Sequence, residues 1–355
     1  MAITPGDRAL ASEYNEIADL VNKIFGDNYS TAAVTDLDKS NHKFGWGALN
    51  LATDIAASEK IFADKLQFLV DRTNVMLDHI AVQDTVLVFA VPSGRTNVSP
   101  NTIVRAQDLN LVKRRIIDVI TANDNNMTVD AENASALVAV PTSGGPYRRT
   151  TPWQGTLSGE HAWTFDDYNH ARYFFNSGGQ LRLLMSLTGG TTSGYNNWSD
   201  VLNEIGVLSF TWNNIIQSSN TFSPGISENK GFYDLTEFYG DGTDAGATDE
   251  GLLFTSAGVT SGGYGYGYGY GYGYGYGYGS YANMNLKLYG KHANNGSEVH
   301  FKIVLDDSAF DQIIDGTTSV TLSYLMPDII TEGTATFNVT PEPTVAVITD
   351  GLASG

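Results

Sequence analysis

The sequence contains no cysteine, and charged residues make up only 17% of its 355 residues. Without cysteine, disulfides and thiolate metal sites are excluded, whereas the compartment stays open between reducing and oxidising. The chain also lacks any apolar run close to the roughly 18 residues of a membrane-spanning helix, and its first residues lack the regions of a signal peptide. We therefore expect a soluble protein that is neither inserted in a membrane nor exported by a conventional signal.

Basic residues are also scarce, because 20 Lys and Arg stand against 39 Asp and Glu, for a formal net charge of −19. No block of Lys and Arg interrupts this acidic excess to offer phosphates a local basic stripe. The charge distribution therefore argues against nucleic acid as a partner.

Motifs of catalysis and metal binding are absent from the sequence. The six histidines show no metal-ligand spacing, and there is no HExxH, GxSxG or Walker-type loop. The nearest approach is Asp241-Gly-Thr-Asp244 with Asp249-Glu250, which could wrap calcium but fails the EF-hand spacing and fits an ordinary acidic turn better. We predict no enzymatic activity, no cofactor and no metal site. A polysaccharide depolymerase, which needs only two suitably placed carboxylates, stays as an alternative without a particular pair.

Helical spacing of apolar residues marks the N-terminal part of the chain. It predicts one helix from Pro5 to Phe25, and a second helical stretch from about Trp46 to Ile80 that is broken into a short and a longer helix. A strand-like apolar run follows at 85–91, and the apolar residues from Leu109 to Ile120 return to helical spacing. We expect the order helix, strand, helix.

An internal repeat relates Thr4–Asn15 to Ser99–Asn110, with a fainter third copy at Gly45–Leu51. Its recurring feature is an apolar residue followed by Asn in the first turns of a helix. This Asn either fills a hydrogen-bonding position on the helix surface or makes the same contact in several equivalent helices of an assembly. The candidate assembly residues are Tyr14, Asn15, Leu49, Asn50, Leu109 and Asn110.

From Tyr147 onward the chain consists of short apolar or aromatic runs separated by Gly, Asn, Asp and Ser. Several runs near the C-terminus alternate with a period of two, which is typical of half-buried antiparallel strands. The 38 Gly and 19 Tyr residues suit a β-rich protein with many turns. We predict an α+β protein, mainly β, in which an N-terminal helical attachment region precedes one or more antiparallel β-sandwich-like domains.

The predicted organisation has six parts. In chain order they are a helical N-terminal region (1–83), a strand and second helical repeat (84–150), a β-rich domain with an aromatic motif (151–260), a Tyr-Gly low-complexity loop (261–281), a β-sandwich-like C-terminal part (282–340) and an extended tail (341–355).

The dipeptide Tyr-Gly is repeated eight times from Tyr264 to Gly279. An extended chain would carry every Tyr on one face, but the alternate glycines make such a strand entropically costly. The tract is interpreted as an expanded Gly-rich hairpin loop, as an ordered contact between subunits, or as a sticky receptor-binding surface. The candidate contact or ligand residues are Tyr264, Tyr266, Tyr268, Tyr270, Tyr272, Tyr274, Tyr276, Tyr278 and Trp163.

Aromatic residues also gather between Trp163 and Gly179, together with Asp166, Asp167, His170 and Arg172. This mixture could form a sugar-binding cleft. The alternative is structural, in which the aromatic residues enter the core, an Asp caps a helical turn that reaches Phe174, and Asn176–Gly179 is a tight exit into a strand near Leu181.

The segment Phe165–Gly179 resembles a motif of virion structural proteins of tailed bacteriophages, especially cyanophages. The pattern Ala-x-x-Tyr-Asn near the N-terminus is similar to the opening of the same proteins. The resemblance implies a component of the neck, tail or fibre that is present in several identical copies, with a trimer as one option, and contacts other virion proteins. Its location would be the virion, assembled in the host cytoplasm. The chain lacks the long collagen-like, heptad or β-helical shaft of a free-standing fibre.

Two other functions remain as alternatives. The chain could be a host-surface adhesin at a fibre or spike tip that binds glycans through its aromatic loops, or a secreted bacterial surface protein, for which a signal sequence is missing.

Overall fold

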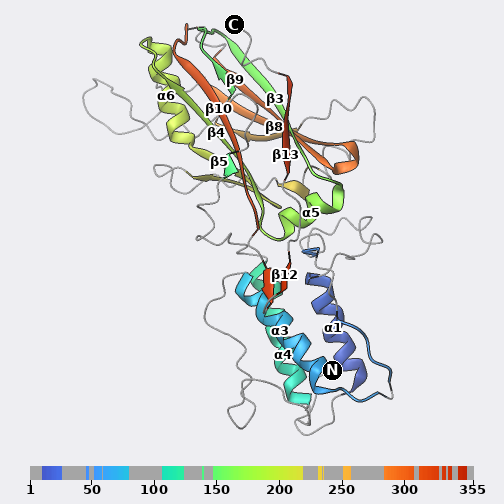
Figure 1. The fold of residues 1–355 in the computed structure, drawn as a ribbon. Coiled ribbons are helices and arrows are strands. Elements are labelled where there is room, and N and C mark those ends of the chain that lie inside the picture. Colours follow the sequence, from blue (N-terminus) through green and yellow to red (C-terminus); the bar gives the residue numbers. More distant parts are fainter. Residues whose placement is uncertain are drawn as a thin grey trace, which may run out of the picture. The chain divides into compact units, whose positions relative to one another are not determined.

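The chain forms two compact units, comprising 1–136, 172–179 and 326–341 in the first and 137–171, 180–325 and 342–355 in the second. Helices and two larger antiparallel sheets make up a mixed fold in which strands predominate (Figure 1). The first long segment of unit 1 ends at Ala136, earlier than the boundary predicted near residue 150. The structure is a computed structural model and describes these parts of the chain, to which the statements below refer: 10–25, 45–47, 52–57, 59–79, 106–123, 138–139, 147–218, 231–233, 235, 251–256, 284–307, 312–327, 330–332, 335–337 and 343–349.

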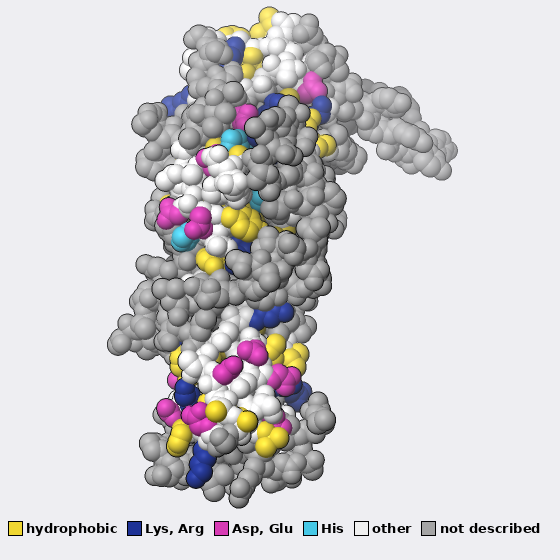
Figure 2. Space-filling view, turned by 90° about the vertical axis from the view of Figure 1, so that its right-hand side faces the viewer, with side chains coloured by type: hydrophobic (Ala, Val, Ile, Leu, Met, Phe, Trp, Pro, Cys, Tyr) yellow, Lys and Arg dark blue, Asp and Glu magenta, His cyan; other side chains and the backbone are white. Residues whose placement is uncertain are grey.

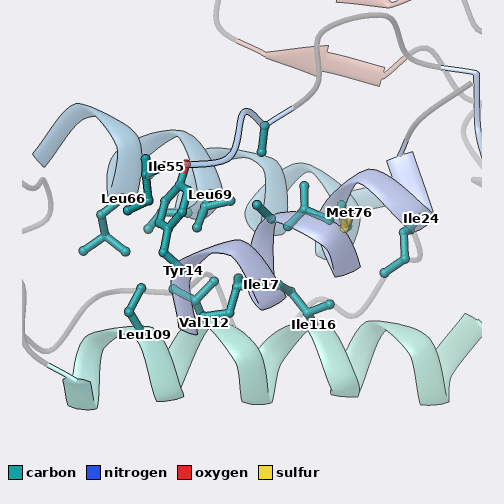
Figure 3. Packing of buried hydrophobic residues seen from close by; sticks show 14 of the residues in the cluster. Tyr14, Ile17, Ile24, Ile55, Leu66, Leu69, Met76, Leu109, Val112 and Ile116 are labelled. Carbon is teal, nitrogen blue, oxygen red and sulfur yellow. The ribbon is translucent and has the colours of Figure 1, made fainter. Parts of the chain in front are cut away.

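Unit 1 is built around three helices, α1 (Ala11–Phe25), α3 (Ala63–His79) and α4 (Ala106–Asn123). Figure 3 shows that the buried residues of all three run through the core in the same direction, from Tyr14 toward Ile24 on α1 and from Leu109 toward Ile116 on α4. The three helices of this single chain are therefore parallel. A small hairpin of β11 (Ile330–Glu332) and β12 (Ala335–Phe337) packs on α3.

The core residues of α1 and α3 follow the spacing three, four, three, and those of α4 the spacing three, four, which is the a and d pattern of a heptad. Each of these side chains is buried: Tyr14, Ile17, Val21 and Ile24 on α1, Leu66, Leu69, Thr73 and Met76 on α3, and Leu109, Val112 and Ile116 on α4. Thr73 is the polar exception, and its hydroxyl donates to the carbonyl oxygen of Leu69 at 2.7 Å, so that its donor is satisfied inside the core.

Parallel packing places the positive ends of three helix dipoles at one end of the bundle, where they repel one another. Each helix has an acidic residue in its first turn, namely Glu13, Asp64 and Asp108. A negative charge near a helix N-terminus stabilises it by about 0.3–1 kcal/mol. The three carboxylates therefore offset the repulsion that the shared direction creates.

The helix predicted from Trp46 to Ile80 is wrong in its first half. Residues 45–47 and 52–57 are not helical, and α3 begins only at Ala63. The reason is a competing set of partners, because side chains of α1 bind the backbone of residues 52–55 in an extended form. The strand predicted at 85–91 lies outside the described residues.

The first sheet of unit 2 has the order β1-β10-β4-β5-β6, and β2 also pairs with β10. All of its pairings are antiparallel. Its central strands alternate, with odd-numbered residues such as Leu183 and Met185 buried in β4. The bounds are β1 Val138–Ala139, β2 Tyr147–Arg149, β4 Gln180–Thr188, β5 Val207–Phe210, β6 Ile215–Ser218 and β10 Thr317–Leu325.

The second sheet has the order β13-β3-β9-β8-β7 and is also antiparallel. Its buried face contacts that of the first sheet through two aromatic pairs, Trp163 with Tyr324 at 6.0 Å and Phe210 with Phe301 at 4.9 Å between ring centroids. Both pairs are near edge-to-face, the arrangement that aromatic rings favour. The bounds are β3 Thr156–Thr164, β7 Gly251–Thr255, β8 Asn285–Ala293, β9 Glu298–Asp306 and β13 Thr344–Thr349.

Two elements of unit 2 differ from the sequence prediction. Residues 344–349 of the predicted extended tail form β13, which pairs with β3. The helix α6 (Ser193–Ile205) was not predicted, although Thr192 caps its start and Gly206, with a φ of 66°, ends it. Its buried residues include Trp198, Val201, Leu202 and Ile205, which have helical spacing, so the signal was present in a region interpreted only as strands.

Candidate functional site

Two asparagines of α1 bind an extended segment of the same chain. Asn15 Nδ2 donates to the carbonyl oxygen of Ile55 at 3.0 Å, and the Ile55 amide donates to Asn15 Oδ1 at 2.9 Å. Asn22 makes the same pair of bonds with Ala52, at 2.9 and 2.8 Å. Each side-chain amide thus offers one donor and one acceptor to a backbone, as a neighbouring β-strand would. We call these two residues the asparagine clamp.

The spacing of the asparagine clamp matches an extended chain. Seven helical residues separate Asn15 from Asn22 and advance about 10.5 Å. Three extended residues separate Ala52 from Ile55 and advance about 10 Å. Ala18 lies between the two asparagines on the same helix face and is fully buried, so its small side chain allows a backbone to approach closely.

All three helices of the bundle begin with the same five-residue pattern, an Ala followed at the fourth position by a buried apolar residue and at the fifth by a side-chain amide. The copies are Ala11–Asn15, Ala63–Gln67 and Ala106–Asn110. The sequence indicated a repeat that relates 11–15 to 106–110, and this repeat therefore has a structural counterpart. The copy at 63–67 was missed because Gln replaces Asn.

The predicted third copy at Gly45–Leu51 is not a helix where the structure describes it, at 45–47, and Leu49 and Asn50 lie outside the described residues. Tyr14 and Leu109, proposed as assembly residues, are fully buried in the bundle core. Their side chains are therefore not available to another subunit. Burial, together with the charges of Asp54 and Asp64, raises the pKa of Tyr14 to about 12, so its hydroxyl stays neutral.

The two asparagines of the repeat have different environments. The asparagine clamp gives Asn15 an intramolecular hydrogen-bonding position, which is the first of the two interpretations of the sequence. Asn110 is half-buried at the corresponding position of α4. Beside it, Lys113 of α4 forms an ion pair with Glu16 of α1.

The end of α1 is capped by residues that follow much later in the chain. The amides of Gly45 and Trp46 both donate to the carbonyl oxygen of Ile24, at 3.1 Å each. Trp46 is fully buried and its ring lies 4.6 Å from that of His79, at the end of α3. His79 Nε2 is 2.8 Å from the carbonyl oxygen of Ser177. The C-terminal ends of α1 and α3 are therefore covered by other parts of their own chain.

The aromatic segment between Trp163 and Gly179 folds as a capped helix with a tight exit, which is the structural alternative to a sugar-binding cleft. Helix α5 spans Tyr168–Asn176, and Asp167 caps it by accepting from the His170 amide at 2.9 Å. The helix ends in a turn in which the Gly179 amide donates to the carbonyl oxygen of Phe174 at 2.8 Å. Strand β4 begins at the next residue. Phe165, Ala171, Phe174 and Phe175 are buried, as the structural alternative predicted.

Trp163 does not form a ligand surface. Its side chain is fully buried on the inner face of β3, where it packs against Tyr324 of β10. The prediction that Trp163 contacts a ligand is therefore wrong, because strand alternation turns this residue to the inside.

The Tyr-Gly tract, with Tyr264 to Tyr278, lies outside the described residues, but the strands on either side of it are described. β7 and β8 pair directly, and beyond their last pair the Ser256 amide donates to the carbonyl oxygen of Leu286 at 2.9 Å. The described chain ends on either side of residues 257–283 therefore lie side by side. β7 is one of the two edge strands in the described order of this sheet.

Charged residues line the outer face of the second sheet. His300 contacts two carboxylates, with Nδ1 3.0 Å from Glu160 Oε1 and Nε2 2.9 Å from Glu298 Oε2. Burial by itself raises the pKa of Glu160, but the hydrogen bond from His300 and the charge of Lys291 outweigh it and hold that pKa below its usual value. Because both carboxylates already bind His300, they are not poised as a free acid and base.

Charge elsewhere is mixed. Among the described residues on the face shown in Figure 2, Lys and Arg are scattered among Asp and Glu and form no continuous basic stripe. Among the described residues, no three His, Asp or Glu side chains come together in an arrangement that could hold a metal ion. The acidic segment at 241–250 lies outside these residues. No helix in the described ranges is long and apolar enough to cross a membrane.

The carboxylate of Asp315 holds the start of α6. It accepts from the amide and the hydroxyl of Thr192, at 3.0 and 2.7 Å, and from the amide and the hydroxyl of Thr191. These hydrogen bonds, led by that of the Thr192 hydroxyl, lower the pKa of Asp315 from 3.8 to about 2. Thr192 in turn caps α6 by accepting from the Tyr195 amide at 3.1 Å.

This hydrogen bonding predicts a specific acid sensitivity. Because the pKa of Asp315 is lower in the folded state, its stabilising contribution is present above about pH 4 and is lost as the pH falls toward 2. The melting temperature should therefore fall less steeply from pH 5 to pH 2 in Asp315→Asn than in the wild type. Asp166→Asn, at an exposed position, is the control and should follow the wild type. Parallel curves for the wild type and Asp315→Asn would contradict the prediction.

Comparison of the chain with family models, curated proteins and solved structures finds no match.

Proposed function

We propose that this chain is a structural subunit of a tailed-phage virion, in which the helical bundle attaches to the neck, tail or fibre apparatus and the β-rich unit projects. The observation that carries the proposal is the bundle itself. It is a parallel three-helix arrangement with heptad packing, the geometry of coiled coils in elongated assemblies, and its apolar stripes are used for packing and not for chemistry. The resemblance of Phe165–Gly179 to virion proteins supports the same function.

The proposal includes several copies per particle. Because Tyr14 and Leu109 are buried within one chain, the copies would associate through other surfaces than the helix stripes. We further propose that the two sheets of unit 2 form a β-sandwich. The aromatic pairs between the sheets, Trp163 with Tyr324 and Phe210 with Phe301, support this arrangement.

Electron cryo-microscopy of the particle that carries the chain tests the proposal. The expected result is density for the bundle and the β-rich unit at regular positions of the neck, tail or fibre. Absence of the chain from purified particles, checked by mass spectrometry, would overturn the proposal and favour the secreted surface protein.

A second candidate function is a glycan-binding adhesin, and one observation favours it. The Tyr-Gly tract joins two directly paired strands at a sheet edge, which is a suitable site for a displayed loop. Exposed tyrosines provide flat rings on which sugars can stack.

Replacing residues 257–283 by a four-residue turn tests the adhesin. We expect the β-rich unit to stay folded and to gain about 2 kcal/mol, because closing a loop of about 4 residues costs less entropy than closing one of about 27. Thermal melting and binding to host cells should be measured on the same protein. Unchanged cell binding would count against the adhesin, and a loss of folding would show that the tract stabilises the unit.

A further inference from the structure

The core stripe of the bundle continues beyond the start of two helices. Leu10 precedes Tyr14 by four residues and Phe62 precedes Leu66 by four, so both occupy the d position of the preceding heptad. Their backbones are equivalent too. The carbonyl oxygen of Leu10 accepts from the amides of Glu13 and Tyr14 at 3.1 and 3.2 Å, and that of Phe62 accepts from Lys65 and Leu66 at the same distances.

These two side chains form what we call the end layer. They are the next layer of a core in which every other described a or d side chain is buried, yet Leu10 is 58% and Phe62 56% exposed. Because the helices are parallel (Figure 3), the residues that precede Tyr14 and Leu66 belong to the same end of the bundle. Leaving two large apolar side chains in water forgoes about 1.5–3 kcal/mol of burial for each.

The surroundings of the end layer indicate the chemistry of its partner. Three helix N-termini meet there, with their positive dipole ends. Glu13, Asp64 and Asp108 add a carboxylate in the first turn of each helix, and Glu13 also accepts from the Leu10 amide at 2.9 Å. The ammonium of Lys65, in the first turn of α3, is directed to the Thr53 hydroxyl at 2.6 Å. A partner surface that complements the end layer would have an apolar centre surrounded by helix C-termini and basic side chains.

We propose that the end layer docks onto the C-terminal end of a parallel three-helix coiled coil of another protein. Its last core residues would cover Leu10 and Phe62, and Lys or Arg in its last turns would pair with the three carboxylates. Helix dipoles would then align head to tail. This inference rests on the attachment function proposed for the bundle.

A second copy of the same chain does not fit. Two identical end layers would bring acidic first turns together, which costs energy. At the opposite end of the bundle, Gly45 and Trp46 cover the last turn of α1, because their amides bind the carbonyl oxygen of Ile24. These residues obstruct a head-to-tail stack of copies at that helix.

The direct test uses the full chain and two synthetic parallel trimeric coiled coils with Ile at a and d positions, one with Lys and one with Glu in the last turn. We expect the chain to bind the Lys-ended coil at least about 10-fold more tightly than the Glu-ended coil in sedimentation or calorimetry. The double variant Leu10→Ser and Phe62→Ser should lose this binding while its melting temperature stays within a few degrees of wild type, since both side chains are exposed.

The matched control is Ile117→Ser, because Ile117 is 48% exposed on α4 but is not part of the end layer. It should bind like the wild type. No binding of the wild type to the Lys-ended coil, or equal binding to both coils, would overturn the proposal.

Incorporation into particles separates this inference from the proposed function. If the wild type is present in particles and the double variant is not, docking is supported in its biological setting. Equal incorporation of the two proteins would overturn docking and leave the virion function intact. Absence of the wild type from particles, with binding to the Lys-ended coil retained, would overturn the virion function and leave docking supported.

Discussion

Replacing Trp163 by Ala is expected to lower the free energy of unfolding of the β-rich unit by about 3–5 kcal/mol. The indole is fully buried between the two sheets and contacts the ring of Tyr324 edge-to-face, so its removal leaves a large cavity and deletes an aromatic pair. Trp163→Phe should lose less, because a ring remains to fill part of the space. Urea titration followed by circular dichroism measures the effect.

The control for Trp163 is Leu184→Ala in the neighbouring sheet. Leu184 faces outward from β4 and is partly exposed, so its truncation should change stability by no more than about 1 kcal/mol. A Trp163→Ala protein as stable as the Leu184→Ala protein would show that the indole is not part of the core, and would revive a ligand-binding role.

Removing the asparagine clamp with Asn15→Ala and Asn22→Ala should destabilise the helical unit by about 2–5 kcal/mol. Each substitution leaves one backbone amide and one carbonyl of a buried residue, Ile55 or Ala52, without a partner, at about 1–3 kcal/mol per site. The sites are about 10 Å apart along α1, so their effects should be roughly additive. Hydrogen exchange gives a specific measurement, because the amides of Ala52 and Ile55 should lose protection.

Two other variants test the mechanism of the clamp. Asn15→Asp keeps the acceptor for the Ile55 amide but loses the donor, so its effect should be intermediate. Asn203→Ala removes an exposed amide of α6 that makes only a 3.4 Å contact with Ser199, and it should leave stability unchanged. Retained protection of Ala52 and Ile55 in the double variant would contradict the role of the clamp.

Periodicity in the sequence predicted those parts of the fold that depend on local patterns, namely buried helix faces, helix ends and strand alternation. The apolar stripes of α1 and α4 lie in the core, and the aromatic motif folds as the capped helix and tight exit that Asp167 and Gly179 indicate. The alternation of β8, β9 and β10 is also present in the burial of these strands. Such signals depend on a few neighbouring residues, so a single sequence contains them.

Features that depend on distant partners were not predictable in the same way. An apolar stripe tells which face of a helix is buried but not its direction, so the parallel arrangement was not foreseen. Segment 52–55 contains residues compatible with a helix, but the asparagine clamp binds its backbone in a non-helical form. Trp163 was interpreted as a surface residue because aromatic composition does not reveal the side of a strand on which a residue lies.

The heptad signal shows how a short pattern can be overlooked. No long heptad shaft exists in the sequence, yet three separate segments share heptad spacing, three, four, three in α1 and α3 and three, four in α4. Each segment is too short to predict a coiled coil alone, since such predictions need several successive heptads. The pattern becomes informative only when the segments are aligned at Ala11, Ala63 and Ala106.

Folding of the parallel bundle does not depend on protein concentration, in contrast to ordinary trimeric coiled coils. In those, folding is coupled to the meeting of three chains, so melting depends on protein concentration. Here the three helices are tethered to one another, and the tether supplies an effective concentration that dilution cannot lower. In a single copy the helical bundle is therefore already assembled at any dilution. Each helix can also contribute a different side chain to one core layer, as Tyr14, Leu66 and Leu109 do.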